Sequence, residues 1–127
     1  MRNKTVLFVS NNENECNLFR EFLSENNRAC PLIVANTCID ALFVLMEMGT
    51  PPDILITEFN MPDMTGFELA EAIRNNQDYD TIHIFVIGSG EEIGKDYTQY
   101  GVESCFVKPT TTESLSAIVS YIVNQYS

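Results

Sequence analysis

The chain has 127 residues, the usual size of one domain, and 45% of them are hydrophobic, which is enough to fill one core. Its 18 acidic and 7 basic residues give a net charge of −11, which repels the phosphate backbone of nucleic acids and anionic membrane surfaces. We therefore expect a single domain over residues 1–127 that binds neither nucleic acid nor membranes directly.

The first predicted elements are a strand over residues 6–9 and a helix that begins after Asn12. Asn12 is a suitable N-cap, and Glu15 stands three residues later, as in a capping box. The apolar residues of this helix recur at i, i+3 and i+7, which predicts one buried face. That face consists of Cys16, Phe19 and Leu23.

The second pair is a strand over residues 32–35 and a helix that ends at Gly49, ahead of two prolines. The apolar residues of this helix also recur at helical spacing. We expect its buried face to consist of Ile39, Leu42, Phe43 and Met46.

The second half of the chain repeats the alternation three times. Strands are predicted over residues 54–57, 82–87 and 105–107, and helices over about 65–76, over about 91–100 and after a capping box from Thr110 to Glu113. The side chains expected to face the core are Phe67, Ala70 and Ile73 in the first of these helices, and Leu115, Ile118, Val119 and Ile122 in the last.

Five strands that alternate with five helices predict an α/β fold. The strands are almost continuously apolar, which is typical of a parallel sheet covered on both faces. Right-handed crossovers between parallel strands then give a three-layer sandwich. A functional site in such a fold lies at the carboxyl ends of the strands.

The sequence indicates neither a metal site nor a targeting segment. Cys16, Cys30, Cys38 and Cys105 form no CxxC pair and have no neighbouring histidine, so each is expected to pack as a small hydrophobic residue. No run approaches the ~18 apolar residues of a membrane helix, and the start of the chain does not look like a signal peptide. We therefore expect a cytoplasmic protein.

The segment from Ile54 to Leu69, ILITEFNMPDMTGFEL, resembles the third strand and following loop of response-regulator receiver domains. The apolar run over residues 6–9 and the pair Lys108-Pro109 occur in the family's order. The chain is thereby identified as a degenerate member of the CheY-like receiver family. This resemblance implies a flavodoxin-like (βα)5 fold with sheet order 2-1-3-4-5 and a role in bacterial two-component or phosphorelay signalling.

The resemblance also places the family's phosphorylation site on this chain. In the family, two acids after the first strand and an aspartate at the end of the third hold magnesium, and that aspartate is phosphorylated. Here Ser10 and Asn11 replace the acid pair, Glu58 replaces the aspartate, and Asn60 would offer its backbone carbonyl. The charges of Glu58 and Lys108 cancel, so we expect weak or absent Mg²⁺ binding and no other cofactor.

The family detects its phosphoryl group through a hydroxyl-bearing residue after the fourth strand, an aromatic residue in the fifth strand, and the lysine. The corresponding positions here are Gly88, with Ser89 beside it, and Cys105, with Phe106 beside it on the opposite face of the strand. Lys108 is retained, and the resemblance implies a cis bond to Pro109. The expected pocket consists of Ser10, Asn11, Glu58, Asn60, Ser89, Lys108 and Pro109.

These substitutions predict a phosphorylation-independent protein-interaction module that is not an enzyme, in which an ion pair between Glu58 and Lys108 fixes one conformation. One alternative is a working receiver that accepts phosphate on Glu58 or another acid, such as Asp63. A flavin-binding domain of similar topology is a second alternative, although the loop after the first strand lacks glycine. We expect a protein partner or homodimer to contact the side that carries Tyr97, Tyr100, Phe106 and Tyr121.

Overall fold

The computed structural model describes residues 5–25, 31–94, 97–108 and 111–125. Its first half contains strand β1 and helix α1, then β2 and α2, with the bounds Val6–Val9, Glu13–Glu25, Leu32–Ala35 and Cys38–Glu47. Its second half contains β3, α3, β4, β5 and α4, with the bounds Ile54–Glu58, Gly66–Arg74, His83–Gly88, Ser104–Val107 and Thr112–Gln125. Two short 3-10 helices, η1 and η2, cover Gln77–Tyr79 and Tyr97–Tyr100.

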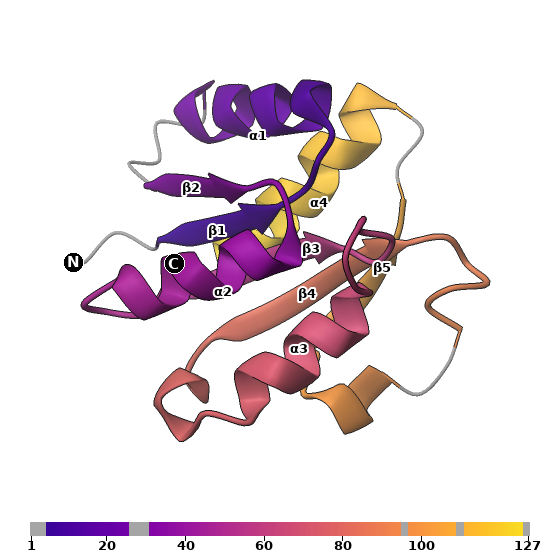
Figure 1. Ribbon diagram of the computed structural model, residues 1–127. Helices are drawn as coiled ribbons and strands as arrows, with labels where there is room; N and C mark the ends of the chain where they lie inside the picture. Colours follow the sequence, from indigo (N-terminus) through magenta and orange to yellow (C-terminus); the bar gives the residue numbers. More distant parts are fainter. Residues whose placement is uncertain (1–4, 26–30, 95–96, 109–110, 126–127) are drawn as a thin grey trace.

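The five strands form one parallel sheet in the order β2-β1-β3-β4-β5 (Figure 1). Helices α2 and α3 pack on one face of this sheet, and α1 and α4 pack on the other. The predicted fold class, strand order and three layers are therefore confirmed. All five strand predictions agree with the structure to within one residue at either end.

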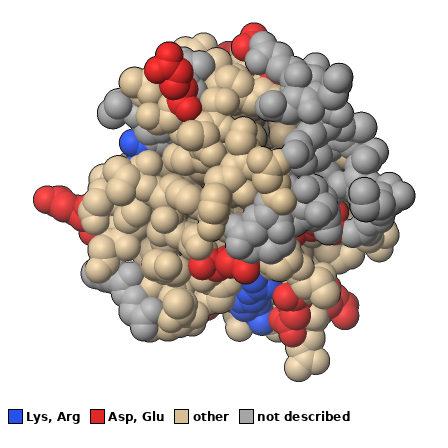
Figure 2. Space-filling model, turned by 180° about the vertical axis from the view of Figure 1, so that it is seen from behind, with Lys and Arg blue, Asp and Glu red and all other residues tan. Residues whose placement is uncertain are grey.

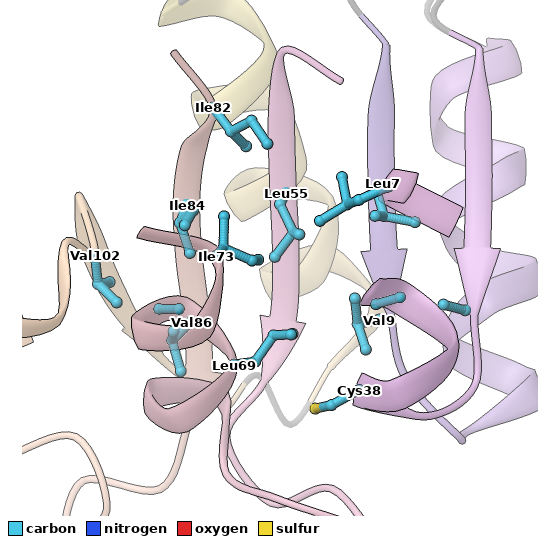
Figure 3. Close-up of a cluster of buried hydrophobic side chains, with 14 of the residues drawn as sticks. Leu7, Val9, Cys38, Leu55, Leu69, Ile73, Ile82, Ile84, Val86 and Val102 are labelled. Carbon is cyan, nitrogen blue, oxygen red and sulfur yellow. The ribbon is translucent and has the colours of Figure 1, made fainter. Parts of the chain in front are cut away.

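Each face of the sheet has its own hydrophobic cluster, because alternate residues of a strand point to opposite faces. Leu7, Leu55 and Ile84 point toward α2 and α3 (Figure 3), whereas Phe8, Ile56 and Phe85 point toward α1 and α4. The predicted inner faces of α1 and α3 are confirmed as buried, and α4 buries Leu115, Val119 and Ile122 with Ile118 partly covered. The core thus explains why the strands read as continuous apolar runs.

The predicted buried face of α2 is wrong. Ile39, Phe43 and Met46 are 46%, 57% and 72% exposed. The side chains that α2 buries against the sheet are Cys38, Ala41 and Leu45, with Leu42 partly covered. Both sets have helical spacing, so periodicity alone could not choose between them. The face with the smaller side chains is the one that packs on the sheet, because Cys38 and Ala41 allow the helix to lie close to the strands.

The predicted helix over about 91–100 is also wrong. After β4, one turn closes through the Ile93 N–H and the Ser89 carbonyl, and the described residues then form only η2. Gly94 falls inside the predicted range, and glycine disfavours a helix interior by about 1 kcal/mol relative to alanine. The chain therefore has four α-helices among its described residues, and η2 overlaps only the last four residues of the fourth predicted one.

Several smaller predictions have mixed outcomes. Thr110, the predicted cap of the last helix, lies outside the described residues, and Thr111 caps α4 by accepting a hydrogen bond from the Ser114 N–H at 3.0 Å. Cys16, Cys38 and Cys105 are free thiols that pack against the core, as expected, whereas Cys30 lies outside the described residues. None of the described helices has the length and apolar character that crossing a membrane requires.

Candidate functional site

A hollow of about 380 Å³ opens at the carboxyl ends of the strands, where the fold predicts a site. Its lining includes most of the pocket residues expected from the sequence and adds one acid, Glu92. The lining residues are Asn11, Asn12, Glu58, Asn60, Ile87, Gly88, Ser89, Glu92 and Lys108. Pro109 and its bond to Lys108 lie outside the described residues.

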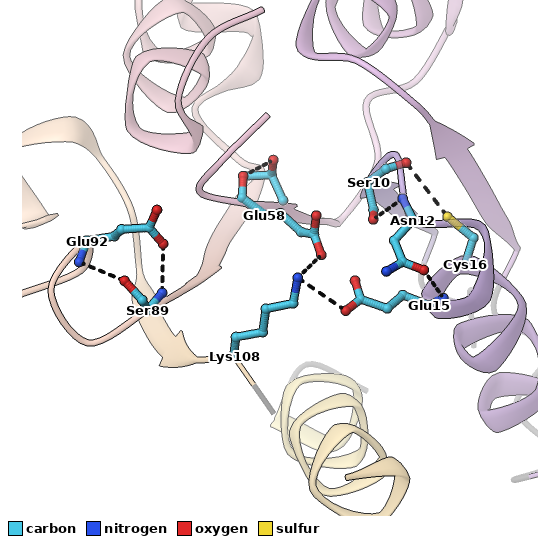
Figure 4. Close-up of polar contacts among 9 residues, drawn as sticks. Ser10, Asn12, Glu15, Cys16, Glu58, Ser89, Glu92 and Lys108 are labelled. Atoms are coloured by element: carbon cyan, nitrogen blue, oxygen red, sulfur yellow. Dashed lines mark hydrogen bonds and ion pairs between the residues drawn. The ribbon is translucent and has the colours of Figure 1, made fainter. Parts of the chain in front are cut away.

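Lys108 lies between two carboxylates (Figure 4). Its Nζ is 3.3 Å from Oε1 of Glu58, the contact that the sequence predicts, and 3.5 Å from Oε1 of Glu15. Glu58 ends β3, Glu15 stands in the first turn of α1, and Lys108 follows β5, so three separate elements meet here. We call this group the carboxylate–lysine cluster.

The three members of the cluster differ in burial. The Glu58 side chain is 8% exposed, whereas that of Lys108 is 49% exposed. Within the described part of the chain, Oε1 of Glu58 is buried and accepts no hydrogen bond. A buried carboxylate oxygen without a hydrogen bond is costly, so the ion pair with Lys108 compensates its charge only in part.

The electrostatics follow from this burial. Burial, followed by the adjacent Glu15 carboxylate, raises the pKa of Glu58 to about 7, against the opposing effect of Lys108. Burial acts to lower the pKa of Lys108, but the carboxylates of Glu58 and Glu15 outweigh it and the pKa is raised. Near neutral pH, Lys108 is therefore charged and Glu58 is a mixture of its protonated and ionised forms.

The two positions that we expect to replace the family's acid pair carry neutral side chains. Ser10 is fully buried, and its hydroxyl accepts a hydrogen bond from the Asn12 N–H at 3.1 Å. Its carbonyl accepts a second one from the Asn36 side chain at 3.0 Å. Asn11 is exposed and carries a neutral amide. Ser10 thus contributes to the turn that starts α1, and neither residue supplies a carboxylate.

The residues at and beside the hollow are more acidic than the sequence indicated. The charge balance expected from Glu58 and Lys108 left out Glu15 and Glu92. Glu92 is engaged elsewhere, because its Oε1 accepts a hydrogen bond from the Ser89 N–H at 2.8 Å. Glu15 and Glu58 both face Lys108. Among the residues that the structure describes, no three His, Cys, Asp or Glu side chains are grouped to hold a metal ion.

Gly88, the position of the switch hydroxyl, is closely surrounded. A Cβ atom added to Gly88 would lie 2.8 Å from Cβ of Phe59 and 3.1 Å from Cγ2 of Ile93. The neighbouring Ser89 offers a hydroxyl, but its Oγ accepts a hydrogen bond from the Glu92 N–H at 3.2 Å. The serine therefore belongs to the turn after β4, and Phe59 occupies the space that a larger residue 88 would need.

Cys105 and Phe106 point to opposite faces of β5, as expected. Cys105 packs against the cluster under α2 and α3, and burial raises the pKa of its thiol to about 11. Phe106 packs on the other face, with its ring 6.2 Å from that of Phe85 and 5.9 Å from that of Tyr121. Phe106 therefore belongs to a different core cluster from Cys105 and does not replace the missing aromatic on the Cys105 side.

Asp63, the other acid considered as a phosphoacceptor, is committed to α2. Its carboxylate accepts hydrogen bonds from the N–H groups of Cys38 at 3.1 Å and Ile39 at 2.8 Å. The slight loss of solvation at Asp63 acts to raise its pKa, but these hydrogen bonds outweigh it, and the pKa lies below its ordinary value. With Thr37 as N-cap, Asp63 satisfies the first N–H groups of the helix.

The expected partner surface is only partly exposed. Tyr97 and Tyr100 pack against the core, and the ring of Tyr100 stacks on that of Phe67 at 5.0 Å. Tyr121 is 53% exposed, and Val107 beside Phe106 is 62% exposed. The two tyrosines of η2 thus stabilise the fold, whereas Tyr121 and Val107 are open to solvent.

Glu15 is the cluster member that the sequence analysis missed. It was expected to complete a capping box, and its N–H does donate to the Asn12 side chain at 3.1 Å. Its carboxylate points toward Lys108 (Figure 4). An acid in the first turn of the helix that follows the first strand, in a chain that keeps Lys108, is the signal that would have suggested Glu15.

The family model for the response regulator receiver domain matches residues 6–120. The two-component response regulator ORR22 of rice, Oryza sativa, is 32% identical over 100 residues, which make up 77% of this chain and 14% of ORR22. The chain thus spans a small part of the length of this curated relative. Because such relatives are plant proteins, the match does not assign the chain to bacteria.

Solved structures of similar fold have low sequence identity. The phosphorylated cyanobacterial phytochrome response regulator RcpA has a TM-score of 0.84 at 20% identity, covering 95% of this chain and 91% of RcpA. The chemotaxis response regulator CheY4 of Vibrio cholerae has a TM-score of 0.78 at 23% identity, covering 95% of this chain and 99% of CheY4. At these identities the likeness concerns the fold.

Proposed function

Because the chain belongs to the response regulator receiver domain family, we propose that it serves two-component or phosphorelay signalling as a protein-interaction module that works without phosphorylation. The observation that carries this proposal is the ammonium of Lys108, which lies within 3.5 Å of both Glu15 and Glu58. The proposal assigns no catalysis to the chain, and it places the protein in the cytoplasm.

The carboxylate–lysine cluster opposes phosphoryl transfer in two ways. Transfer to a carboxylate requires the charge on the phosphoryl oxygens to be neutralised, chiefly by a metal ion. Here Lys108 contacts the carboxylates that would bind that ion, and Ser10 and Asn11 add none. In addition, the protonated form of Glu58 present near pH 7 is a poor nucleophile.

The positions that would transmit phosphorylation are also replaced. Gly88 has no hydroxyl to move toward a phosphoryl group, and Phe59 packs against it. Cys105 has no ring to change rotamer. We infer that the contacts of Lys108 with Glu15 and Glu58 hold the loops after β1, β3 and β5 in one arrangement. The partner then recognises a surface that does not depend on a kinase.

The decisive experiment is incubation with acetyl phosphate and Mg²⁺, followed by intact-protein mass spectrometry at neutral pH. The proposal predicts no gain of a phosphoryl group by the native chain. A variant that restores the family's acids, Ser10→Asp with Asn11→Asp and Glu58→Asp, serves as the positive control. If it does not fold, a receiver domain with the intact acid set takes its place.

A Mg²⁺-dependent gain of mass that disappears in Glu58→Gln would overturn the proposal. Glu58 would then be the phosphoacceptor, with its carboxylate oxygen forming a bond to phosphorus as acetate leaves. A gain that persists in Glu58→Gln but disappears in Asp63→Asn would assign the same role to Asp63. Treatment with beryllofluoride provides a second readout, since an active site would show Mg²⁺-dependent shifts in the NMR signals of Glu58 and Gly88.

A further inference from the structure

The outer side of α2 carries an apolar stripe that the sheet does not cover. Ile39, Phe43 and Met46 are 46%, 57% and 72% exposed, and we call them the outer stripe. In Figure 1, α2 lies on the near side of the sheet, with no described element over its outer side. None of the three residues lines the hollow around Glu58, so the stripe is independent of the chemistry there.

The helix is apolar on both sides, which is unusual for a surface helix. Its inner side buries Cys38, Ala41 and Leu45 against the sheet, and its outer side presents the stripe. A helix that is apolar all round is normally buried all round. The α2 helix has a partner on one side only, so its composition fits an assembly in which the outer side is covered too.

The spacing of the outer stripe is that of a heptad seam. Ile39, Phe43 and Met46 are separated by four and then three residues, the alternation with which one helix packs along another. Asp40 and Glu47 each follow a seam residue and are exposed beside the stripe. With Ile39 and Met46 at heptad position d and Phe43 at position a, Asp40 and Glu47 fall at position e. Charges at position e influence which partner helix binds.

The charged side chains of α2 are all acidic. Residues 29–73 contain no Lys or Arg, and α3, which packs beside α2, adds the exposed acids Glu68 and Glu71. A second copy of the chain would bring another charge of −11 against this side. A basic partner instead gains attraction at long range and at the seam edges.

We propose that the outer stripe of α2 is the docking site for an amphipathic helix of a partner protein. That helix has apolar residues at heptad spacing and Lys or Arg at the positions that face Asp40 and Glu47. The contact covers about two turns, roughly 10 Å along the helix axis, and centres on Phe43.

The test is a selection from displayed helical peptides of about 20 residues, long enough to form a helix on their own. Seam positions vary among Leu, Ile, Met, Ala and Ser, and flanking positions vary among Lys, Arg, Gln and Glu. Selection against the native chain should enrich large apolar residues at the seam and Lys or Arg at the flanks. The affinity of the best peptide is then measured by fluorescence anisotropy.

Phe43→Ser should weaken the binding of this peptide by about tenfold or more, because a central apolar anchor is lost. Asp40→Asn combined with Glu47→Gln should weaken binding and reduce its dependence on salt. Tyr121→Ser is the matched control, since Tyr121 is 53% exposed on another side of the molecule, and it should leave the affinity unchanged. All replaced side chains are exposed, so each variant should keep its native circular dichroism spectrum.

Three results would overturn the proposal. The first is selection without any preference for Lys or Arg at the flanks, or with no peptide enriched at all. The second is binding that Phe43→Ser leaves intact, which would indicate general attraction to an acidic protein. The third is a native dimer in sedimentation experiments that Phe43→Ser dissociates, which would make a second copy the occupant.

Discussion

At the scale of single residues, Lys108 contacts two carboxylates at once. Its ammonium lies 3.3 Å from Glu58 and 3.5 Å from Glu15, so these carboxylates already have a cationic neighbour. A divalent ion that binds the same carboxylate oxygens must either displace the Lys108 ammonium or lie close to its positive charge. Both are unfavourable, since like charges a few ångströms apart repel strongly in a partly buried site.

This position leads to a prediction about magnesium. In Lys108→Ala the two carboxylates lose their cationic neighbour, and one or two carboxylates with water suffice to hold Mg²⁺. We expect Lys108→Ala to bind Mg²⁺ at least about tenfold more tightly than the native chain at pH 8. The measurement is a Mg²⁺ titration followed by the amide NMR signals of residues near Glu58.

Lys108→Arg is the control, because it keeps the positive charge and should bind Mg²⁺ as weakly as the native chain. Equal Mg²⁺ affinities for native chain and Lys108→Ala would show that Lys108 does not limit cation binding.

Glu58 leads to a prediction about pH. Its pKa rises from 4.5 to about 7 on folding, so the folded chain binds this proton more tightly than the unfolded chain does. The tighter binding of this proton therefore stabilises the folded chain fully below about pH 4.5, and this stabilisation is lost as the pH rises through 7. Glu58→Gln removes the titrating group. At pH 8 we expect it to exceed the native chain in free energy of unfolding by roughly 1–3 kcal/mol.

Urea denaturation at pH 5 and at pH 8 measures this effect. The gain from Glu58→Gln should be much smaller at pH 5, where native Glu58 is protonated in the folded chain. Glu71→Gln, a change to an exposed acid on α3, controls for the general loss of negative charge. A gain of equal size at both pH values would mean that Glu58 is not the group responsible.

At the scale of elements, the residue that follows β3, Phe59, packs against the last residue of β4, Gly88. Phe59 follows β3 directly, and its N–H donates a hydrogen bond to the Ile87 carbonyl of β4 at 2.7 Å. Its ring packs edge-on against Phe67 of α3 at 5.1 Å. These contacts hold Phe59 close to Cα of Gly88, so that a Cβ atom at position 88 would clash with it. The packing of β3, β4 and α3 therefore favours glycine at this position.

A hydroxyl-bearing side chain placed at position 88 should therefore destabilise the fold. We expect Gly88→Thr to lower the free energy of unfolding by about 1–3 kcal/mol, because its Cβ would lie 2.8 Å from Cβ of Phe59. Gly90→Thr is the matched control in the same loop, where an added Cβ meets nothing within 4 Å. Chemical denaturation of both variants gives the comparison, and equal losses would mean that Phe59 does not restrict position 88.

At the scale of the whole molecule, acidic charge is combined with open apolar and uncharged surface. Figure 2 shows that most of the described surface on the side opposite Figure 1 is uncharged, with acidic side chains scattered over it and its largest basic patch beside acidic ones. Together with the net charge of −11, this distribution favours basic protein partners and opposes self-association.

Much of this fold could be predicted from the sequence. The five strands are short apolar runs whose character does not depend on their neighbours, and the alternation with helices allows few topologies. The family resemblance located Glu58, Lys108, Ser10 and Gly88. Helix faces were harder, because α2 has two apolar sides and periodicity cannot tell which one the sheet covers. The expected helix over about 91–100 did not form, and Gly94 in its interior disfavours a helix there.

By itself, the sequence determined the strands and the layer arrangement, and it predicted which residues stand at the family's phosphorylation positions. Only the tertiary structure decided that Glu15 of α1 joins Glu58 at Lys108, that Phe59 restricts Gly88, and that the outer stripe of α2 is open to solvent. The physical reason is that each of these facts is a contact, or a missing contact, between side chains from distant parts of the chain. Local periodicity reports which residues share a face, but the packing of elements decides what that face meets.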